Sequence, residues 1–305
     1  MIYSVTLNPS IDYVIGLPQL QLGLVNRLTS DHKLPGGKGI NVSRILEQLA
    51  IPSVALGFAG GFTGRFLTDC LDALHLKTDF TPIAEDSRIN VKLKAEAETE
   101  LNAAGPTIHK SEIAAFKTTL HQRLQPGDIV VMAGSLPTGL PATFYRDLIP
   151  AIKAANAEFV IDTTGQALLD TLAAHPYVVK PNHHELAELF GDKEYQSLGE
   201  TVDAGRKLLA LGAQHVLVSM AGKGALMITQ DHAYHGYVQS APVLNSVGAG
   251  DSMLAGFTGT LSQTGSALEA FKVALACGSA TAFSIDLADK AKIDQVLATI
   301  TIDEL

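Results

Sequence analysis

Residues 245–252 read Asn-Ser-Val-Gly-Ala-Gly-Asp-Ser and lead into a sequence typical of a helix. Asp251 therefore lies at a helix start, where the first backbone N–H groups lack partners within the helix and attract anions. A carboxylate that accepts a proton, beside amides that bind phosphate oxygens, is what phosphoryl transfer to an alcohol requires. Tight packing of a helix start, with Asp251 favoured there by the helix dipole, is the alternative explanation.

Three further polar segments follow predicted strands or open helices. Residues 35–42 contain glycines that let a ligand approach the backbone, and Lys38 and Asn41 add a cation and an amide. Asp12 follows the first strand, where its carboxylate would accept hydrogen bonds from a polyol or cap a turn. Ser135 follows another apolar run and has the same two explanations. Each segment alone fits a turn as well as a binding site.

Lys180, Asn182 and Glu185 follow the predicted strand at 177–180. Oxygen donors of this kind suit Mg²⁺, directly or through its waters, and Lys180 suits a phosphate. A capping box from Asn182 to Glu185 explains the same spacing without a ligand. The segment therefore predicts either a metal-bound nucleotide or a capped helix start.

Two segments suit the remainder of a nucleotide. The turn at 219–225 contains glycines that fit either a nucleotide contact or a hairpin into the next apolar run. The last long helix, predicted at 270–283, carries small residues from 276 to 280 that permit close packing against a helix or a planar base.

Composition excludes some classes of partner. The chain has 305 residues, a formal net charge of −9 and 47% hydrophobic residues, which disfavours a general nucleic-acid or membrane-surface binder. Several of its basic residues, among them Arg27, Lys38 and Arg88, lie in the first third, which fits a local anion site. The two cysteines, Cys70 and Cys277, lie in apolar helical patterns and are expected to be buried thiols rather than a disulfide. The chain opens on a strand pattern without a leader, so a cytoplasmic location is expected.

Short apolar runs alternate with helical patterns along the chain. Strands are predicted at 54–59, 129–133, 159–162, 177–180 and 216–220. Helices are predicted at 38–49, 64–74, 111–124, 141–155 and 201–211, with Pro141 at a first helical position. Strands that are apolar throughout and alternate with helices predict an α/β fold, a doubly wound and mostly parallel sheet flanked by helices. Ligands bind beyond the carboxyl ends of such strands, where the polar segments fall.

Two segments break this alternation. Residues 12–34 and 88–102 lack helical periodicity and contain β-compatible stretches such as Ile-Asn-Val-Lys-Leu-Lys at 89–94. They predict a small sheet that stands off the main domain. It would be either a pair of surface hairpins or a lid over a site.

Taken together, the motifs resemble those of the ribokinase-type (PfkB-type) carbohydrate kinases. Both signature regions of that family are present, at Gly36–Asn41 and Asn245–Ser252, and the resemblance covers the whole chain in order. It implies one kinase domain over residues 1–305 with a β-sheet lid from 12–34 and 88–102. It also implies ATP as cosubstrate, Mg²⁺ as cofactor and a homodimer formed through the lid.

Within the family, the stretch Arg-Ile-Asn-Val-Lys at 88–92 most resembles the branch that phosphorylates fructose 1-phosphate at C6. The branch that phosphorylates tagatose 6-phosphate at C1 is the alternative. A noncatalytic sensor of sugar phosphate or nucleotide on the same fold is a third, although a sensor has no need of a base.

The resemblance implies roles for individual residues. Asp251 would be the base, and the catalytic backbone amides would be those of Gly248, Ala249 and Gly250. The substrate would be bound by Asp12, Arg27, Gly36, Gly37, Lys38, Asn41, Arg88 and Ser135, with Lys38, Arg27 and Arg88 on its phosphate. The nucleotide would contact Lys180, Asn182, Ser219, Ala221, Gly222, Gly224 and Ser279. Glu185 would hold Mg²⁺ through water.

Overall fold

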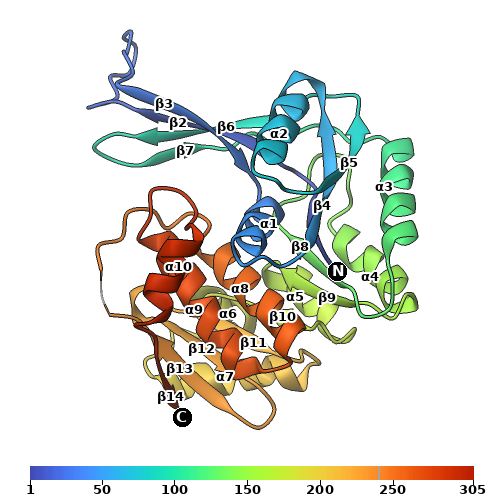
Figure 1. Ribbon diagram of the computed structural model, residues 1–305, viewed down its shortest axis with the longest axis vertical. Coiled ribbons are helices and arrows are strands. Elements are labelled where there is room, and N and C mark those ends of the chain that lie inside the picture. Colours follow the sequence, from blue (N-terminus) through green and yellow to red (C-terminus); the bar gives the residue numbers. More distant parts are fainter. Residues whose placement is uncertain (240) are drawn as a thin grey trace.

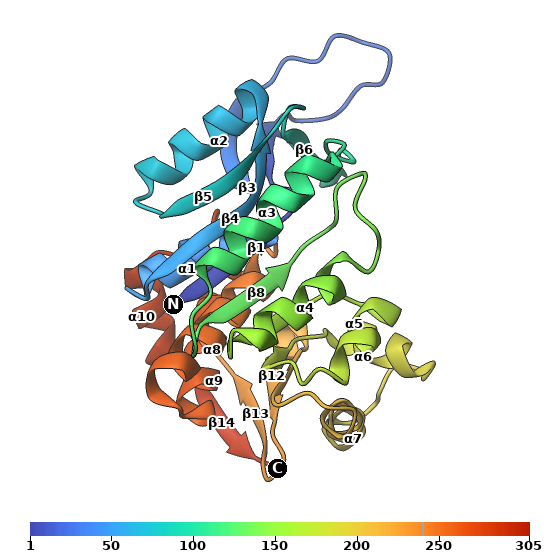
Figure 2. The same cartoon turned by 90° about the vertical axis from the view of Figure 1, so that its right-hand side faces the viewer.

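The computed structural model describes residues 1–239 and 241–305, and within these residues a 10-stranded sheet forms the centre of the molecule (Figures 1 and 2). Its strand order is β14-β13-β12-β11-β10-β9-β8-β1-β4-β5. The strands from β11 to β5 in that order run parallel, and β12, β13 and β14 are antiparallel additions. The strands are β1 Ile2–Thr6, β4 Ser53–Gly60, β5 Thr78–Ile83, β8 Ile129–Ala133, β9 Glu158–Asp162, β10 Val178–Val179, β11 Val216–Ser219, β12 Ala225–Ile228, β13 Ala233–Tyr237 and β14 Thr301–Glu304.

Helices cover both faces of this sheet. The helices are α1 Lys38–Gln48, α2 Gly61–Ala73, α3 Lys110–Arg123, α4 Phe144–Ala154, α5 Gly165–Leu172, α6 His183–Phe190, α7 Leu198–Ala210, α8 Ala249–Thr264, α9 Ala267–Ala282 and α10 Lys290–Leu297, with a 3₁₀ turn η1 at Ala221–Lys223. Helices α3 to α7 bury their apolar side chains with one face of the sheet, and α1, α8, α9 and α10 with the other. The predicted α/β architecture is therefore confirmed.

Strand β8 shows why the central strands are apolar throughout. Ile129 and Val131 belong to the core on the α8 and α9 face, whereas Val130 and Met132 belong to the core on the opposite face. Because side chains alternate across a strand, a strand covered on both faces must be apolar at every position. The predicted strand boundaries agree with the structure to within one or two residues.

Four helix starts differ from their predictions by three residues: the helices predicted from 64, 141, 201 and 270 begin at Gly61, Phe144, Leu198 and Ala267. Helix α4 begins at Phe144, after the cap residue Thr143, and Pro141 lies in the preceding turn, where its carbonyl accepts a hydrogen bond from the Phe144 amide at 2.9 Å. Proline suits a turn as well as a first helical position, so it did not locate the helix start. No helix in the described part of the chain is long and apolar enough to span a membrane.

A second, 4-stranded sheet extends away from the main body (Figure 1). Its strands are β2 Ser10–Gly16, β3 Ser30–Gly36, β6 Arg88–Lys94 and β7 Thr99–Leu101, in the order β3-β2-β6-β7. The small separate sheet expected from the sequence is thus present. The loop from 17 to 29, which joins β2 to β3, projects beyond the sheet in both views (Figures 1 and 2).

Helix α1 lies unusually close to the central strand β1. A Cβ added to Gly39 would lie 2.4 Å from the Thr6 hydroxyl oxygen and 2.7 Å from the Val5 carbonyl oxygen. Only glycine permits this approach, which buries Ile40 and Val42 and fixes the first turn of α1 over the end of β1.

We expect Gly39→Ala to lower the free energy of unfolding by about 2 kcal/mol, because the added methyl forces helix and strand apart. Gly199→Ala is the matched control. Gly199 is likewise the second residue of its helix, α7, but a Cβ there meets only the Ser197 hydroxyl at 3.9 Å. Urea denaturation should show the control as stable as the wild type or slightly more so. Equal stabilities of the two variants would contradict the close approach.

Candidate active site

A polar cavity of about 620 Å³ lies where the parallel strands end, between the main sheet and the small sheet. Its floor comes from residues at or after the carboxyl ends of β8, β9, β10 and β11, and its opposite wall from β2 and β6. Among the predicted site residues it contains Asp12, Gly37, Lys38, Asn41, Arg88, Ser135, Lys180, Asn182, Glu185, Ser219, Gly248, Gly250 and Asp251. Residues far apart in sequence therefore meet at one edge of the sheet, as the fold requires.

An apolar cavity of about 450 Å³ adjoins the first. Val238, Leu275 and Phe283 line it, together with the predicted nucleotide residues Ala221, Gly222, Gly224 and Ser279. The two cavities share Asn182, Ser219 and Gly250. An apolar slot joined to a polar chamber suits a molecule with a planar base at one end and charged groups at the other.

Asp251 is buried at the start of α8, with 6% of its surface exposed. The turn before it depends on Gly248, which adopts φ 80° as the helix cap. One carboxylate oxygen, Oδ2, accepts a hydrogen bond from Asn41 Nδ2 at 2.9 Å. Burial, and then the nearby carboxylate of Asp162, raise the pKa of Asp251 to about 6. Asn41 thus orients the carboxylate, a contact that the sequence did not predict.

Asp162, at the end of β9, is a site residue that the sequence analysis missed. Its buried carboxylate pairs with Lys38 Nζ at 2.9 Å and Lys180 Nζ at 3.4 Å. Burial opposes ionisation of Asp162, but the two ammonium groups outweigh burial and lower its pKa. The cluster keeps two cations beside Asp251. An aspartate that ends an apolar strand is the only signal the sequence offered, and it is a weak one.

The glycine turn presents fewer free amides than predicted. The amides of Gly248 and Gly250 have no acceptor among the described residues, and both glycines line the polar cavity. The Ala249 amide already donates to the Ser246 carbonyl at 3.4 Å, and Ala249 faces the apolar cavity. Two of the three expected donors therefore remain available to an anion.

Residues 182–185 form the capping box that the spacing allowed. Asn182 Oδ1 accepts the amides of His184 and Glu185, each at 2.9 Å, and Glu185 Oε2 accepts the Asn182 amide at 2.8 Å. The structural explanation is therefore correct, but Glu185 also lines the polar cavity.

Glu185 fits a Mg²⁺ ion carried by phosphates. Its second oxygen, Oε1, has no partner among the described residues, and the cavity around it contains Lys38 and Lys180. The described residues contain no group of three or more His, Cys, Asp or Glu side chains that could hold a metal. Mg²⁺ usually keeps several waters and binds one or two carboxylates plus phosphate oxygens, so a single carboxylate is compatible with it.

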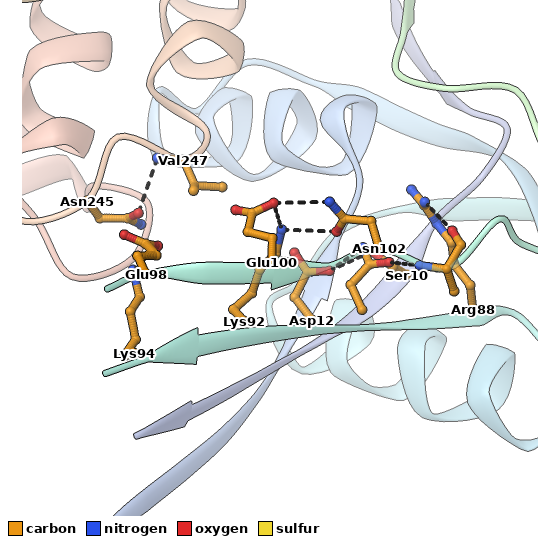
Figure 3. A network of polar contacts seen from close by, with 12 residues as sticks. Ser10, Asp12, Arg88, Lys92, Lys94, Glu98, Glu100, Asn102, Asn245 and Val247 are labelled. Carbon is orange, nitrogen blue, oxygen red and sulfur yellow. Dashed lines mark hydrogen bonds and ion pairs between the residues drawn. The ribbon is translucent and has the colours of Figure 1, made fainter. Parts of the chain in front are cut away.

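The small sheet supplies a hydrogen-bonded wall (Figure 3). Asp12 Oδ1 accepts Ser10 Oγ at 2.7 Å and Asn90 Nδ2 at 3.0 Å. Arg88 donates to the main-chain carbonyls of Asn8 at 3.1 Å and Ala103 at 2.9 Å. Gly36 packs on Asp12, since a Cβ there would lie 2.6 Å from its carboxylate.

Four polar residues of this wall were not predicted as site residues: Ser10, Asn90, Lys92 and Asn102. Arg88, Asn90 and Lys92 alternate along β6 and so share one face of the sheet. Applied to residues 88–92, this periodicity would have found Asn90 and Lys92, whereas Asn102 lies beyond β7 and had no such signal.

Two predicted phosphate contacts lie elsewhere. Lys38 lies beside Asp162 and within the electrostatic reach of Asp251, at the catalytic end of the cavity and not with Arg88. Arg27 is exposed in the loop from 17 to 29 and lines neither cavity, because that loop extends beyond the small sheet. The three basic residues predicted to contact the substrate's phosphate are therefore divided among three places.

Comparisons with known proteins agree with this geometry. The family model described as pfkB family carbohydrate kinase matches residues 5–292. A 1-phosphofructokinase of Bacillus subtilis is 47% identical over 305 residues, with both chains fully covered, and a D-tagatose-1-phosphate kinase of Bacillus licheniformis is 36% identical with the same coverage. Phosphofructokinase-2 of Escherichia coli, solved with substrates and products, superposes with a TM-score of 0.92 at 28% identity, covering 97% of this chain and 98% of that one. The family model covers most of the chain and the Bacillus subtilis relative covers all of it, so this protein belongs to the pfkB family of carbohydrate kinases.

Proposed function

We propose that the protein transfers the γ-phosphoryl group of ATP to the C6 hydroxyl of D-fructose 1-phosphate, which yields fructose 1,6-bisphosphate and ADP. The observation that carries this proposal is the position of Asp251, buried where a cation-walled polar cavity meets an apolar cavity. The choice of sugar rests on the 1-phosphofructokinase of Bacillus subtilis and on the residues of β6.

Asp251 would accept the proton of the attacking hydroxyl as the new O–P bond forms and the bond from the γ-phosphorus to the β-phosphate oxygen breaks. Its raised pKa makes it a better proton acceptor than an ordinary aspartate, and near neutral pH it remains mostly ionised. Asn41 holds one oxygen and leaves the other for the substrate. Asn41 is thereby a positioning residue for the base, in addition to any contact with the sugar.

Charge that develops on the transferred group would be met by fixed donors. The free amides of Gly248 and Gly250 lie at the positive end of α8, and Lys38 and Lys180 stand on the same side of the cavity. Removal of one such preorganised donor costs about 3 kcal/mol of transition-state stabilisation in comparable sites.

The nucleotide base would occupy the apolar cavity, among Val238, Leu275 and Phe283, with the phosphates directed toward Asn182 and Ser219. Mg²⁺ would be held through water by Glu185 and would neutralise charge on the phosphates of ATP. The capping box keeps Glu185 Oε2 engaged, so that only Oε1 is offered to the hydrated ion.

The sugar would lie with its hydroxyls toward Asp12 and Gly37 and its phosphate toward Arg88 and Ser135. The small sheet would act as a lid, because one of its faces forms a wall of the cavity. Asn41 would bridge the sugar and Asp251.

The protein would also form a homodimer through this lid. The loop from 17 to 29 exposes five large apolar side chains. In a monomer these side chains would face water, and exposed apolar patches of this kind mark interaction surfaces. Their exposed fractions are 43% for Leu20, 87% for Leu22, 66% for Leu24, 89% for Val25 and 43% for Leu28. A second copy of the same loop is the partner that would cover them. Arg27 would then lie at this interface.

An ADP-release assay with candidate sugars tests the proposed substrate. We expect kcat/KM for fructose 1-phosphate to exceed that for tagatose 1-phosphate, tagatose 6-phosphate, fructose 6-phosphate and fructose by at least tenfold. Tagatose 1-phosphate also offers a C6 hydroxyl and differs only in configuration at C4, so it is the most demanding comparison. A preference for tagatose 6-phosphate would identify the other branch, and release of ADP with none of the sugars would favour a sensor.

The pH dependence of turnover tests the base. Only the ionised carboxylate of Asp251 accepts a proton, so kcat should fall as the pH drops through about 6. In Asp162→Asn the neighbouring negative charge is lost and the lysines are freed, and both changes lower the pKa of Asp251. The fall in kcat on the acidic side of the pH profile should therefore occur at lower pH in that variant.

The substrate's own phosphate also titrates near pH 6, but it is the same for both proteins. The difference between wild type and Asp162→Asn, rather than either midpoint, reports the enzyme group. If kcat falls at the same pH in both proteins, Asp251 is not the group whose ionisation controls turnover.

Sedimentation velocity tests the dimer. The wild type should sediment as a dimer at micromolar concentration, and the double variant Leu22→Asp with Val25→Asp as a monomer, because charges cannot be buried at a paired apolar loop. Leu211→Asp, which places the same charge at an exposed leucine after α7, is the control and should remain dimeric. A monomeric wild type would exclude this interface.

A further inference from the structure

Lys92 is a largely buried cation of the small sheet's inner wall and has no role in the mechanism proposed for the enzyme. Only 11% of its side chain is exposed. Its ammonium pairs with Glu100 Oε2 at 2.6 Å and donates to Asn102 Oδ1 at 3.3 Å (Figure 3). Asn102 in turn donates to Glu100 Oε2 at 3.1 Å, so the three side chains hold one another in place.

The three members of this cluster differ in their exposure to the cavity. Lys92 and Asn102 line the polar cavity, whereas Glu100 lies behind them on β7 with 36% of its side chain exposed. An ammonium has three donors, and two of those on Lys92 have acceptors among the described residues. One donor therefore remains for a ligand in the cavity.

The two cations of this wall, Arg88 and Lys92, differ in whether a carboxylate is paired with them. Arg88 gives its described hydrogen bonds to neutral main-chain carbonyls, and the carboxylate of Asp12 acts on it through space without a direct ion pair. The charge of Lys92 is offset by Glu100, whose pKa is lowered first by its hydrogen bond from Lys92. A phosphate with two negative charges matches two cations, and here the second cation already has a counter-ion.

We propose that Lys92 is a receptor for the substrate's phosphate and that Glu100 is the internal counter-ion with which that phosphate competes. The pair thereby selects a dianionic group. A neutral hydroxymethyl group offers no charge that can draw Lys92 from Glu100, while a phosphate does. The same competition weakens retention of the bisphosphate product, which carries the identical group. The inference rests on the proposed function only in taking a phosphorylated ketohexose as the ligand.

Titration calorimetry with fructose 1-phosphate, and separately with fructose, tests the inference on the intact enzyme without ATP. Lys92→Met should weaken binding of fructose 1-phosphate by roughly 10- to 100-fold, the value of a hydrogen bond to a charged group. Lys92→Arg should restore much of the loss. Glu100→Gln should tighten binding about two- to fivefold, because removal of a half-exposed like charge favours the dianion. Fructose should bind all variants equally weakly.

In the kinetic assay the Lys92→Met loss should appear in KM for the sugar phosphate with kcat changed little, since the phosphate is remote from the reacting hydroxyl. KM for ATP should be unaffected. The neighbouring pair Lys94 and Glu98 supplies matched controls, being a similar ion pair on the same hairpin that does not line the cavity. Lys94→Met and Glu98→Gln should leave both constants unchanged.

Binding of fructose 1-phosphate to Lys92→Met within twofold of the wild type would overturn the receptor role. Weaker binding to Glu100→Gln would overturn the counter-ion role, since it would make Glu100 a support for Lys92. Lys92-dependent binding without sugar-dependent ADP release would sustain the inference and defeat the proposed function. A wild type that binds fructose 1-phosphate no better than fructose would defeat the inference whether or not ADP is released.

Discussion

A buried carboxylate beside another buried carboxylate is the constraint around which this site is built. Asp251 and Asp162 would repel each other, and both are removed from water. Lys38 and Lys180 offset this repulsion by pairing with Asp162, and Asn41 donates a hydrogen bond to Asp251. Lys38 and Asn41 come from the first turn of α1 and Lys180 from the end of β10, so the charge balance holds only while those two elements keep their positions on the sheet. The close packing of α1 on β1 therefore also fixes the positions of Lys38 and Asn41 beside the two carboxylates.

The two sheets divide the work of the site. The main sheet is covered on both faces and fixes the reacting end, where the base, the free amides and the two lysines lie. The small sheet contributes Asp12, Arg88 and Lys92 to the cavity wall, and it extends away from the main body (Figure 1). In the proposed mechanism the main sheet therefore carries the chemistry, and the small sheet contributes to recognition of the sugar phosphate. Relatives that act on fructose 1-phosphate and on tagatose 1-phosphate are compatible with this division.

The sequence predicted the fold well because its strands are apolar at every position and its helices are amphipathic. It also predicted Asp251, since a glycine-rich turn before a carboxylate is specific. It did not predict Asp162 or the orienting role of Asn41, because ion pairs and hydrogen bonds between residues more than 100 positions apart leave no local pattern. It grouped Lys38 and Arg27 with Arg88, whereas the structure places Lys38 beside Asp162 and Arg27 in the exposed loop from 17 to 29, because nearness in sequence does not determine which part of a site a side chain reaches. Local hydrogen bonding at Asn182 was ambiguous, because a cap and a ligand site demand the same residues.

The claim that Asp251 is the base is tested most directly by Asp251→Asn, which keeps the shape and the hydrogen bond from Asn41 but cannot take a proton. Turnover and ATP affinity should be measured on the same preparation, with calorimetry for the nucleotide. We expect kcat to fall by about 10²- to 10⁴-fold, the usual contribution of general base catalysis, while ATP binds as it does to the wild type. A kcat within a few-fold of the wild type, or lost ATP binding with turnover preserved, would contradict it.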